Sequence, residues 1–400
     1  MSERTSLGTA KLSDFADVNP ENLGAATRPD FAFRYVDLSS VSGGRIQHGP
    51  TSACSFGSAP SRARRRLRPG DVLFGTVRPA QRSHALFDGD GTTVASTGFA
   101  VLRARPGDGV SSFLRHFVLS DDAARQAHRS EVGSGYPAVN EVDVSALALP
   151  QFGVEEQRRI AEVLDTVDEA IRAVERIVTM LGSVRHGLLL ALMRPEASWR
   201  RGTLGDRLLR IESGKSPPTT DRRPAAGEWG VLKVSSVAGG GFRPEEAKAI
   251  VPAQRRPQDV VRLGDLLMTR ANTAQFVGLA CRVDRLPGPL QLSDKTLRLV
   301  PRPDVVPQFL LHALQTPWCR RVVQALGTGT SAGMKNISQA EIRSISLAFP
   351  DRAEQQRTVE VLDGADARIH AEEAGVRSLH DLRAGLADDL LTGRVRTVPG

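Results

Sequence analysis

The chain contains two copies of one long segment. Residues 156–192 align without a gap with residues 354–390, because 354 − 156 and 390 − 192 both equal 198. The motif Val-Leu-Asp at 163–165 recurs at 361–363, and Arg185 recurs as Arg383. A gapless match of this length is not expected by chance. The chain is therefore expected to fold as two copies of one structural plan.

Shorter matches extend the duplication toward the N-terminal side of each segment. Arg-Pro-Gly-Asp at 68–71 parallels Arg-Leu-Gly-Asp at 262–265, and alternating, strand-like runs close the halves at 142–150 and 342–350. The offset drifts from 194 (262 − 68) to 200 (350 − 150), so the loops differ while the scaffold is kept. The expected order is a domain at 1–150, a helix at 151–197, a domain at 198–350, and a helix with a C-terminal tail at 351–400.

The duplicated segment predicts a long helix. Residues 155–193 contain no proline, and their apolar residues recur at alternating steps of three and four, the heptad spacing of a coiled-coil seam. At ~1.5 Å per residue, a helix of about 38 residues is roughly 57 Å long. An amphipathic helix on a local core is the alternative, but helices in globular proteins usually have about 8–20 residues. The second copy covers 355–392.

The two predicted helices are expected to pack on each other. Arg185 and Arg383 interrupt the apolar spacing at equivalent places, which indicates antiparallel packing in one register, because polar seam residues fix register. Pro195 and Gly393 are the expected helix ends. The predicted seam consists of Leu164, Val167, Ile171, Val174, Val178, Leu181, Leu188 and Leu192 in the first helix, and Leu362, Ala365, Ile369, Val376, Leu379, Leu386 and Leu390 in the second.

The regions before the helices have the pattern of mixed domains. Short apolar runs alternate with Gly, Pro, Ser and Asn, which is typical of strands joined by irregular loops. Strands are predicted at 72–77, 266–270 and 296–300, and one helix is predicted near the end of each domain, at 113–129 and at 309–326. The fold class is therefore expected to be α+β, with two similar domains separated by two long antiparallel coiled-coil helices in a pseudo-two-fold repeat.

The composition is that of a basic globular protein. Lys and Arg number 53 against 45 Asp and Glu, a formal charge of +8, which favours a polyanionic partner such as nucleic acid. Nearly all of this positive charge is arginine, and GC-rich genomes also encode arginine-rich proteins. Charge alone therefore does not establish a nucleic-acid partner. Three distant cysteines, no apolar N-terminal region and no apolar run near ~20 residues indicate a soluble, cytoplasmic protein without membrane contact.

No catalytic or metal-binding motif is present. The methyltransferase motifs are missing, and the segment 327–336 lacks the Gly-Lys-Ser/Thr ending of a phosphate loop, so a flexible loop is expected there. The eight histidines are scattered and are expected at surface or capping positions rather than as metal ligands. Nothing in the sequence indicates a nuclease cluster, although scattered acidic residues leave that possibility open. The chain is expected not to be an enzyme and to hold no metal.

Basic residues in polar loops are the remaining candidates for function. Arginine can contact phosphates or bond bidentately to guanine in the major groove, while the alternative is an ordinary solvated surface. Arg78 and Arg270 each close the strand that follows a Gly-Asp motif. The candidate DNA-binding residues are Arg62, Arg64, Arg65, Arg66, Arg78, Arg82, Lys215, Arg222, Arg223, Lys233, Arg255, Arg256, Arg270 and Lys335.

The order of these motifs resembles a known family. The run 262–272, the sequence Leu-Ser-Asp-Lys at 292–295, and Glu-Gln at 156–157 and 354–355 are similar to the specificity subunits of type I restriction-modification enzymes. The resemblance covers both halves, although the first half departs from it at 76–83, where Thr-Val-Arg-Pro replaces Arg-Ala-Asn.

The resemblance implies a non-catalytic DNA-reading subunit. Each domain would read one half of a split, asymmetric target in double-stranded DNA, and the helices would fix the gap between the halves. Two methyltransferase subunits carrying S-adenosylmethionine, and nuclease/translocase subunits using ATP and Mg²⁺, would dock on the chain, which itself would bind no cofactor. A coiled-coil protein–protein scaffold without DNA readout and an unrecognised enzyme are the alternatives.

Overall fold

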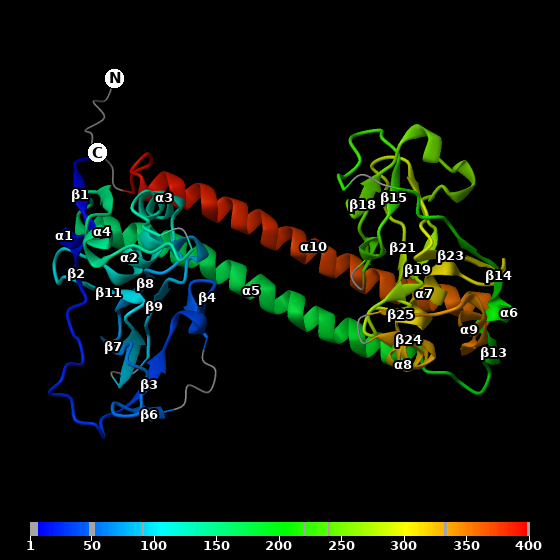
Figure 1. Ribbon diagram of the computed structural model, residues 1–400, viewed down its shortest axis with the longest axis horizontal. Helices are drawn as coiled ribbons and strands as arrows, with labels where there is room; N and C mark the ends of the chain where they lie inside the picture. The colour runs from blue at the N-terminus through cyan, green and yellow to red at the C-terminus, as the bar shows by residue number, and fades with distance from the viewer. Residues whose placement is uncertain are drawn as a thin grey trace. The chain divides into compact units, whose positions relative to one another are not determined.

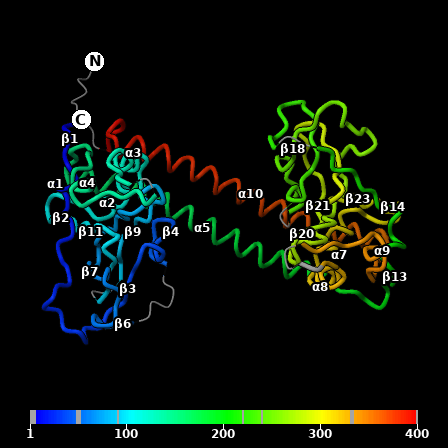
Figure 2. The backbone as a smooth tube through the Cα atoms, in the orientation of Figure 1, coloured from blue at the N-terminus to red at the C-terminus, as the bar shows by residue number. Residues whose placement is uncertain are grey.

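The computed structural model describes residues 7–47, 53–89, 92–133, 135–218, 221–238, 241–331 and 334–397. The chain forms two compact units, unit 1 (Met1–Arg176 with Glu372–Gly400) and unit 2 (Ile177–Ala371). Each unit contains one β-rich domain and half of each of two long helices, α5 (Val154–Leu192) and α10 (Arg352–Leu391) (Figure 1). The chain passes from the first domain through α5 into the second and then enters α10 (Figure 2). The expected α+β class is confirmed.

The long helices have 39 and 40 residues, close to the lengths predicted. Helix α10 begins three residues earlier than expected, and the Asp351 side chain accepts a bond of 2.8 Å from the Glu354 amide in its first turn. Such a side-chain acceptor satisfies one of the backbone N–H groups that a helix start leaves without a partner. Helix α10 ends at Leu391, and Gly393 follows with φ +73°, a left-handed conformation that favours glycine after a helix.

The two long helices run antiparallel. In unit 1, Asp168 of α5 is paired with Arg383 of α10, and in unit 2, Arg185 of α5 is paired with Asp366 of α10. None of the apolar residues predicted for the seam is exposed. The most deeply buried of them are Leu164, Ile171, Leu362 and Leu390.

The domain of unit 1 is built on two four-stranded sheets, with strand orders β2-β11-β8-β9 and β6-β3-β10-β7. Strand β1 pairs with β12 next to the start of α5. The strands are β1 (Thr9–Lys11), β2 (Ala16–Val18), β3 (Ala32–Val36), β4 (Val41–Ser42), β5 (Arg45–Ile46), β6 (Ala53–Ser55), β7 (Ala63–Arg66), β8 (Val72–Gly75), β9 (Ala85–Leu86), β10 (Thr93–Ser96), β11 (Phe99–Ala104) and β12 (Ala148–Pro150). The helices of the domain are α1 (Leu12–Phe15), α2 (Ser111–Val118), α3 (Asp121–Arg129) and α4 (Glu141–Ser145), with 3-10 turns η1 (Leu38–Ser40) and η2 (Pro79–Gln81).

The domain of unit 2 repeats this plan. Its main sheet has the order β14-β23-β19-β21, and β13 pairs with β26 as β1 pairs with β12. The strands are β13 (Arg200–Thr203), β14 (Leu208–Ser213), β15 (Gly230–Leu232), β16 (Val237–Ala238), β17 (Gly241–Phe242), β18 (Ala247–Ala249), β19 (Leu266–Thr269), β20 (Ala271–Asn272), β21 (Ala280–Arg282), β22 (Leu290–Gln291), β23 (Thr296–Pro301), β24 (Thr328–Ser331), β25 (Met334–Asn336) and β26 (Ser346–Phe349). The helices are α6 (Leu204–Arg207), α7 (Pro307–Gln315), α8 (Pro317–Leu326) and α9 (Gln339–Ser344), with 3-10 turns η3 (Val234–Ser236), η4 (Pro252–Gln254) and η5 (Pro257–Asp259).

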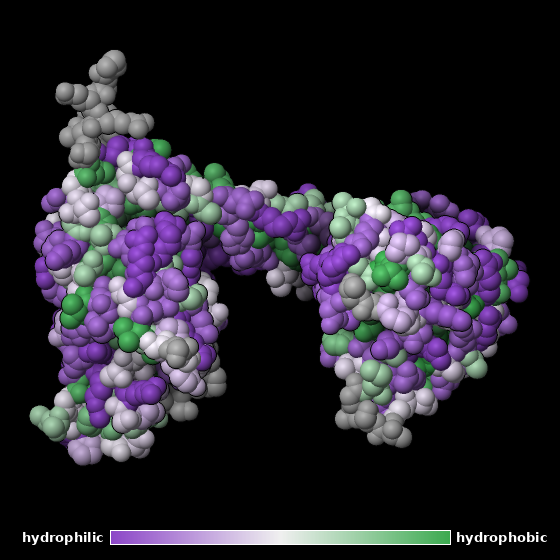
Figure 3. All heavy atoms as spheres, turned by 45° about the horizontal axis from the view of Figure 1, so that its top comes forward, coloured by the Kyte–Doolittle hydropathy of each residue, from purple (hydrophilic) through white to green (hydrophobic). Residues whose placement is uncertain are grey.

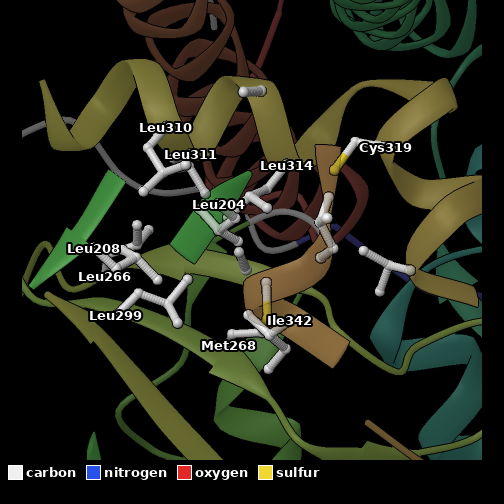
Figure 4. Packing of buried hydrophobic residues seen from close by; sticks show 14 of the residues in the cluster. Leu204, Leu208, Leu266, Met268, Leu299, Leu310, Leu311, Leu314, Cys319 and Ile342 are labelled. Atoms are coloured by element: carbon white, nitrogen blue, oxygen red, sulfur yellow. The ribbon is translucent and has the colours of Figure 1, made fainter. Parts of the chain in front are cut away.

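Each unit has its main core between the sheet, the domain helices and the long helices. In unit 2, leucines of α6, α7, β19 and β23 converge on Met268 and Ile342 (Figure 4). Leu192 and Leu362 pack in the same core, and their counterparts Leu390 and Leu164 belong to the core of unit 1 together with Phe117. The long helices are therefore part of both cores, because their apolar residues are buried against the domains as well as against each other.

Three local predictions were wrong. The segments 113–129 and 309–326 each form two helices, because Ser120 and Thr316 accept hydrogen bonds as N-caps of α3 and α8. The alternating runs at 142–150 and 342–350 begin as helices α4 and α9 and become strands only at their ends. The expected loop 327–336 contains strands β24 and β25, which pair with each other and with β20; residues 332 and 333 lie outside the described residues.

Candidate nucleic-acid interface

A buried glutamine anchors the start of each long helix to its own domain. Gln157 accepts a bond from the Val110 amide at 3.0 Å and donates to the carbonyl oxygens of Asp108 and Phe152 at 2.8 and 3.0 Å. Because a buried amide without partners is costly, the Glu-Gln motif is explained by helix anchoring rather than by ligand binding. In unit 2, Gln355 makes the same bonds with Val306, Asp304 and Pro350.

A histidine joins the domain of unit 1 to both long helices. His116 of α2 is buried, and its Nε2 lies 2.9 Å from Asp165 of α5, while its Nδ1 lies 3.4 Å from the Arg383 guanidinium of α10. Arg115 bonds to Asp165 and to Asp168, each at 2.8 Å. A tautomer with the proton on Nε2 donates to Asp165 and accepts from Arg383, so the imidazole is satisfied in its neutral form.

The same cluster recurs in unit 2. His312 of α7 is buried, with Nε2 3.1 Å from Asp363 of α10 and Nδ1 3.4 Å from the Arg185 guanidinium of α5. Gln308 donates to Asp363 at 2.9 Å, as its counterpart Ser112 donates to Asp165 in unit 1. The offset is 196 for the histidines (312 − 116) and 198 for the aspartates (363 − 165), so the near-constant spacing of a His and an Asp was the signal that sequence reasoning missed.

Burial and hydrogen bonding set the protonation of these clusters. Burial lowers the pKa of His116 and of His312 below the usual histidine range, more than their aspartate partners raise it. Burial raises the pKa of Asp165, but bonds from His116 and Ser112 outweigh this effect and lower it to about 2. The clusters at neutral pH therefore consist of neutral imidazoles, ionised carboxylates and guanidinium groups.

The expectation that histidines lie at the surface was wrong for His84, His116 and His312, each 1% exposed. His84 stacks on Phe74 with ring centroids 4.2 Å apart and accepts a bond from the Gly75 amide. These histidines fill and link the cores. His48 lies outside the described residues.

The histidine clusters are the groups of possible metal ligands among the described residues. Their ligand atoms lie within 4.8 Å of one another in each cluster. Asp165, Asp168 and Asp366 are already paired with guanidinium groups, and these positive charges would repel a divalent cation. We interpret both clusters as ion-pair networks that hold the helices against the domains. The clusters are His116, Asp165 and Asp168, and His312, Asp363 and Asp366.

The repeated Gly-Asp motif is also structural. Asp71 is buried and holds Arg103 of β11 through two bonds of 2.8 Å, and Asp265 holds Arg298 of β23 at 2.8 Å. The glycines before them, Gly70 and Gly264, have φ +90° and +86°, a conformation that other residues rarely adopt. The arginines continue the network to acidic residues of the neighbouring strands or loops, Glu21 and Glu212.

Half of the candidate DNA-binding residues, seven of fourteen, are paired with acidic residues within the protein. Ion pairing of this kind positions side chains on their own domain and reduces the positive charge that is free for a polyanion. The pairs are Arg65 with Glu141, Arg66 with Glu21, Arg82 with Asp121, Arg222 with Glu228, Arg223 and Lys233 with Glu246, and Arg256 with Asp259.

The other seven candidates make no ion pair with a carboxylate of the described residues. Arg62, Lys215 and Arg270 are exposed, and their side chains bond to no described residue. Arg64, Arg78 and Arg255 lie over aromatic rings, and Lys335 donates to the carbonyl oxygen of Gly329 at 3.1 Å. Their partner rings are Phe56, Tyr136 and Trp229. These residues are the cations of the candidate set that remain available to a nucleic acid.

Arg78 and Arg270 do not occupy equivalent places. Strand β8 ends at Gly75 and β19 ends at Thr269, so Arg270 follows its strand directly while Arg78 lies further along the chain. The Thr76 amide donates to Gly98 as the Arg270 amide donates to Lys295, both at 2.8 Å. Thr76 is therefore the counterpart of Arg270.

A cavity of about 600 Å³ lies in unit 2 between α7, α8 and the strand β13. Trp199 and Trp318 line it together with Arg201 and with apolar and hydroxyl-bearing residues, and the lining contains no carboxylate, histidine or cysteine. The hydroxyl groups of this lining therefore have no histidine or carboxylate beside them in the cavity that could act as a general base. Among the described residues, no helix combines the length and the apolar character that crossing a bilayer requires.

Comparisons with known proteins agree with this architecture. The chain is 27% identical over 195 residues to the type I restriction enzyme EcoEI specificity subunit of Escherichia coli, which covers 48% of the chain and 33% of that subunit. It is 22% identical over 292 residues to the MjaVIII specificity subunit of Methanocaldococcus jannaschii, covering 66% of each. The matched part of the chain thus spans about a third of the length of the EcoEI subunit and just under two thirds of the length of the MjaVIII subunit.

A solved structure matches the whole chain. A chain from a structure on complex assembly and conformational transition of the type I R-M system is 25% identical, with a TM-score of 0.64, and the match covers 99% of this chain and 100% of that one. No protein-family model matches the sequence.

Proposed function

The chain belongs to the family of type I restriction-enzyme specificity subunits, and we propose from this that it reads DNA for a restriction-modification complex and performs no chemistry itself. The domains at 1–150 and 198–350 each recognise one half of a split, asymmetric target from the major groove. The helix pair fixes the unspecified gap between the half-sites.

One observation carries this proposal. The same buried scaffold is built twice, with Gln157 and Gln355 anchoring the helices and Asp71 and Asp265 holding the sheets, yet the free cations differ. The domain of unit 1 presents Arg62 and Arg78, whereas that of unit 2 presents Lys215 and Arg270. Equal scaffolds with unequal contact groups suit two unlike sequences, because base contacts and not the scaffold carry specificity.

The surface of the long helices supports docking of two copies of one partner. Val163 and Leu382 are exposed in unit 1, at 38% and 52%, and their counterparts Val361 and Val184 are exposed in unit 2, at 45% and 57%. The offset is 198 in both cases (361 − 163 and 382 − 184). The face of each unit that Figure 3 shows is covered largely by hydrophilic side chains. Two equivalent apolar faces fit two methyltransferase subunits.

The cofactors of the proposed complex belong to these partners. S-adenosylmethionine is held by the methyltransferase subunits, ATP and Mg²⁺ by the nuclease/translocase subunits, and none by this chain. Double-stranded DNA is the substrate that the chain contacts, and the complex acts in the cytoplasm.

The test is methylation of a random DNA library by the full chain in complex with its methyltransferase subunits. Reading the modified bases is expected to give two short specified sequences separated by a constant gap, and the chain alone is expected to modify nothing. Modification without any sequence preference would support the alternative, a scaffold that does not read DNA. Modification or cleavage by the chain alone would reveal an enzyme.

The spacing function has its own test. Deleting residues 174–180 and 372–378 removes one heptad from each helix and leaves the pairs Asp168–Arg383 and Arg185–Asp366 in place. At ~1.5 Å per residue the helices shorten by roughly 10 Å, which is about 3 base pairs of DNA. The gap is expected to shorten while both half-sites stay the same. A changed half-site with an unchanged gap would contradict the spacing role.

A further inference from the structure

Backbone pairing identifies one place that is equivalent in the two domains and differs chemically. The Val139 amide donates to Thr76, and the Ile337 amide donates to Arg270, both at 3.0 Å. One residue further, Val77 pairs with Ala138, as Ala271 of β20 pairs with Asn336 of β25. In both domains, the segment that follows the Gly-Asp strand therefore pairs with a second segment in the same register.

This register assigns counterparts that sequence alignment had missed. Two residues beyond Thr76 and Arg270 stand Arg78 and Asn272. Two residues before Ala138 and Asn336 stand Tyr136 and Met334. Arg78 with Tyr136 in unit 1 thus corresponds to Asn272 with Met334 in unit 2, and we call these the variable pairs.

The variable pair of unit 1 is open to solvent. Tyr136 is 74% exposed, and the guanidinium carbon of Arg78 lies 4.7 Å from the centre of its ring. Arg78 is itself exposed and makes no ion pair with a described residue. Stacking restrains the guanidinium and leaves its in-plane N–H groups free to bond to two acceptors at once.

The backbone around Arg78 is held in an unusual conformation. Arg78 has φ +50° and Arg82 has φ +49°, at the two ends of the turn η2. Residues other than glycine rarely adopt such angles, and they occur where surrounding contacts impose them, often at functional sites. The Arg78 amide donates to the Pro137 carbonyl at 2.7 Å, and this bond ties the turn to the loop that carries Tyr136.

The variable pair of unit 2 has different groups in the same place. Asn272 accepts a bond from the Thr273 amide at 2.8 Å through its side-chain oxygen, and its side-chain amide makes no bond to a described residue. Met334 is 47% exposed. Lys335 pairs with Asn272 across the strands β25 and β20, and adds a positive charge beside it.

We propose that the variable pairs choose the base in each half-site, with Arg78 selecting a guanine and Asn272 selecting an adenine. This inference rests on the proposed DNA-reading function. Arginine bonds bidentately to O6 and N7 of guanine, and asparagine bonds bidentately to N6 and N7 of adenine. Asn272 turns its amide outward to do so and releases the local bond to Thr273. Tyr136 and Met334 are the apolar contacts beside them.

The test is the motif modified by the full chain in complex with its methyltransferase subunits, read on a random DNA library. Replacing Arg78→Ala is expected to lower discrimination for guanine at one position of one half-site by about 10- to 100-fold, with the gap and the other half-site unchanged. Asn272→Ala is expected to do the same for one adenine of the other half-site. In each variant, unchanged recognition of the other half-site shows that the protein is folded.

A second variant separates base contact from phosphate contact. Arg78→Lys keeps the charge but lacks the planar fork of donors that stacks on Tyr136, so it is expected to weaken the guanine preference, although less than Arg78→Ala does. Arg78→Ala with a uniform loss of modification at all sequences, restored by Arg78→Lys, would overturn the inference and make Arg78 a phosphate contact. If the wild-type complex modifies no split motif, the proposed function fails; if it does and both alanine variants keep that motif, only this inference fails.

Discussion

The Arg185 guanidinium on α5 donates from Nε to Oδ1 of Asp366 on α10 at 2.9 Å. The contact is repeated between Arg383 and Asp168, since 383 − 185 and 366 − 168 both equal 198. In each unit a buried histidine of the domain lies against the same pair. The arginines that interrupt the apolar spacing, and that were predicted to fix the helix register, therefore also link each helix pair to its domain.

Removing one partner of this contact is expected to destabilise unit 2. Arg185→Ala leaves Asp366 partly buried without its partner, at a cost of about 1–3 kcal/mol in the free energy of unfolding. Denaturant unfolding of the single and double alanine variants measures the coupling between the two residues. Arg176→Ala, at an exposed position of α5, is the control and is expected to change little. Additive effects of the two substitutions would show that the pair contributes no coupling.

Each anchoring glutamine is expected to stabilise its helix start. Gln355→Leu removes three hydrogen bonds and leaves the Val306 amide without its acceptor, at a cost of about 2 kcal/mol or more. Thermal unfolding measures the loss. Gln356→Leu, at the exposed neighbouring position, introduces the same side chain and is the matched control. Equal melting temperatures of the two variants would contradict the anchoring role.

Stability is expected to fall as the pH drops below the ordinary histidine pKa. The pKa of His84 is lowered to about 3 by burial first and by the charge of Arg82 second, and burial also lowers the pKa of His116 and His312. The unfolded chain therefore binds protons near pH 6.5 that the folded chain does not, so acidification favours unfolding. For His84 alone the loss between pH 7 and pH 5 is about 2 kcal/mol.

Unfolding by denaturant at pH 7 and pH 5 tests this sign. His84→Gln is expected to reduce the pH dependence, because glutamine does not titrate, even if the variant is less stable at both values. The lowered pKa of Asp165, about 2, adds a second loss of stability as the pH falls from about 4 toward 2. A chain that is more stable at pH 5 than at pH 7 would contradict the neutral, buried state of these histidines.

The equivalent exposed apolar residues of the long helices are expected to bind one partner copy each. Val184→Asp and Leu382→Asp should each reduce the methyltransferase copies in the complex from two to one, because a carboxylate in an apolar contact loses its hydration. Native mass determination of the complex gives the stoichiometry. Ser183→Asp, at an exposed neighbouring position on α5, is the control. Retention of two copies by the Val184→Asp, Leu382→Asp double variant would exclude these faces.

The local sequence pattern did not predict the secondary structure correctly where side-chain hydrogen bonds and strand pairing determine it. Residues 113–129 have the spacing of one helix, yet Ser120 caps α3 with its side chain and divides the segment in two. The loop expected at 327–336 contains strands because β20 offers an edge to β25. Half of the basic candidates are paired with acids, some of them far away in sequence, such as Arg65 with Glu141 and Arg82 with Asp121, and charge counting does not reveal such pairs.

The sequence by itself determined the plan of the protein, because a gapless repeat with heptad spacing imposes two equal domains and two long antiparallel helices. Only the tertiary structure decided which polar side chains remain available to another molecule. The sequence does not reveal that Gln157, His116 and Asp71 are structural, and folding places their polar groups against partners within the protein. Arg78 became the counterpart of Asn272 only through strand register, since hydrogen bonding between distant segments, and not spacing along the chain, sets which residues are equivalent.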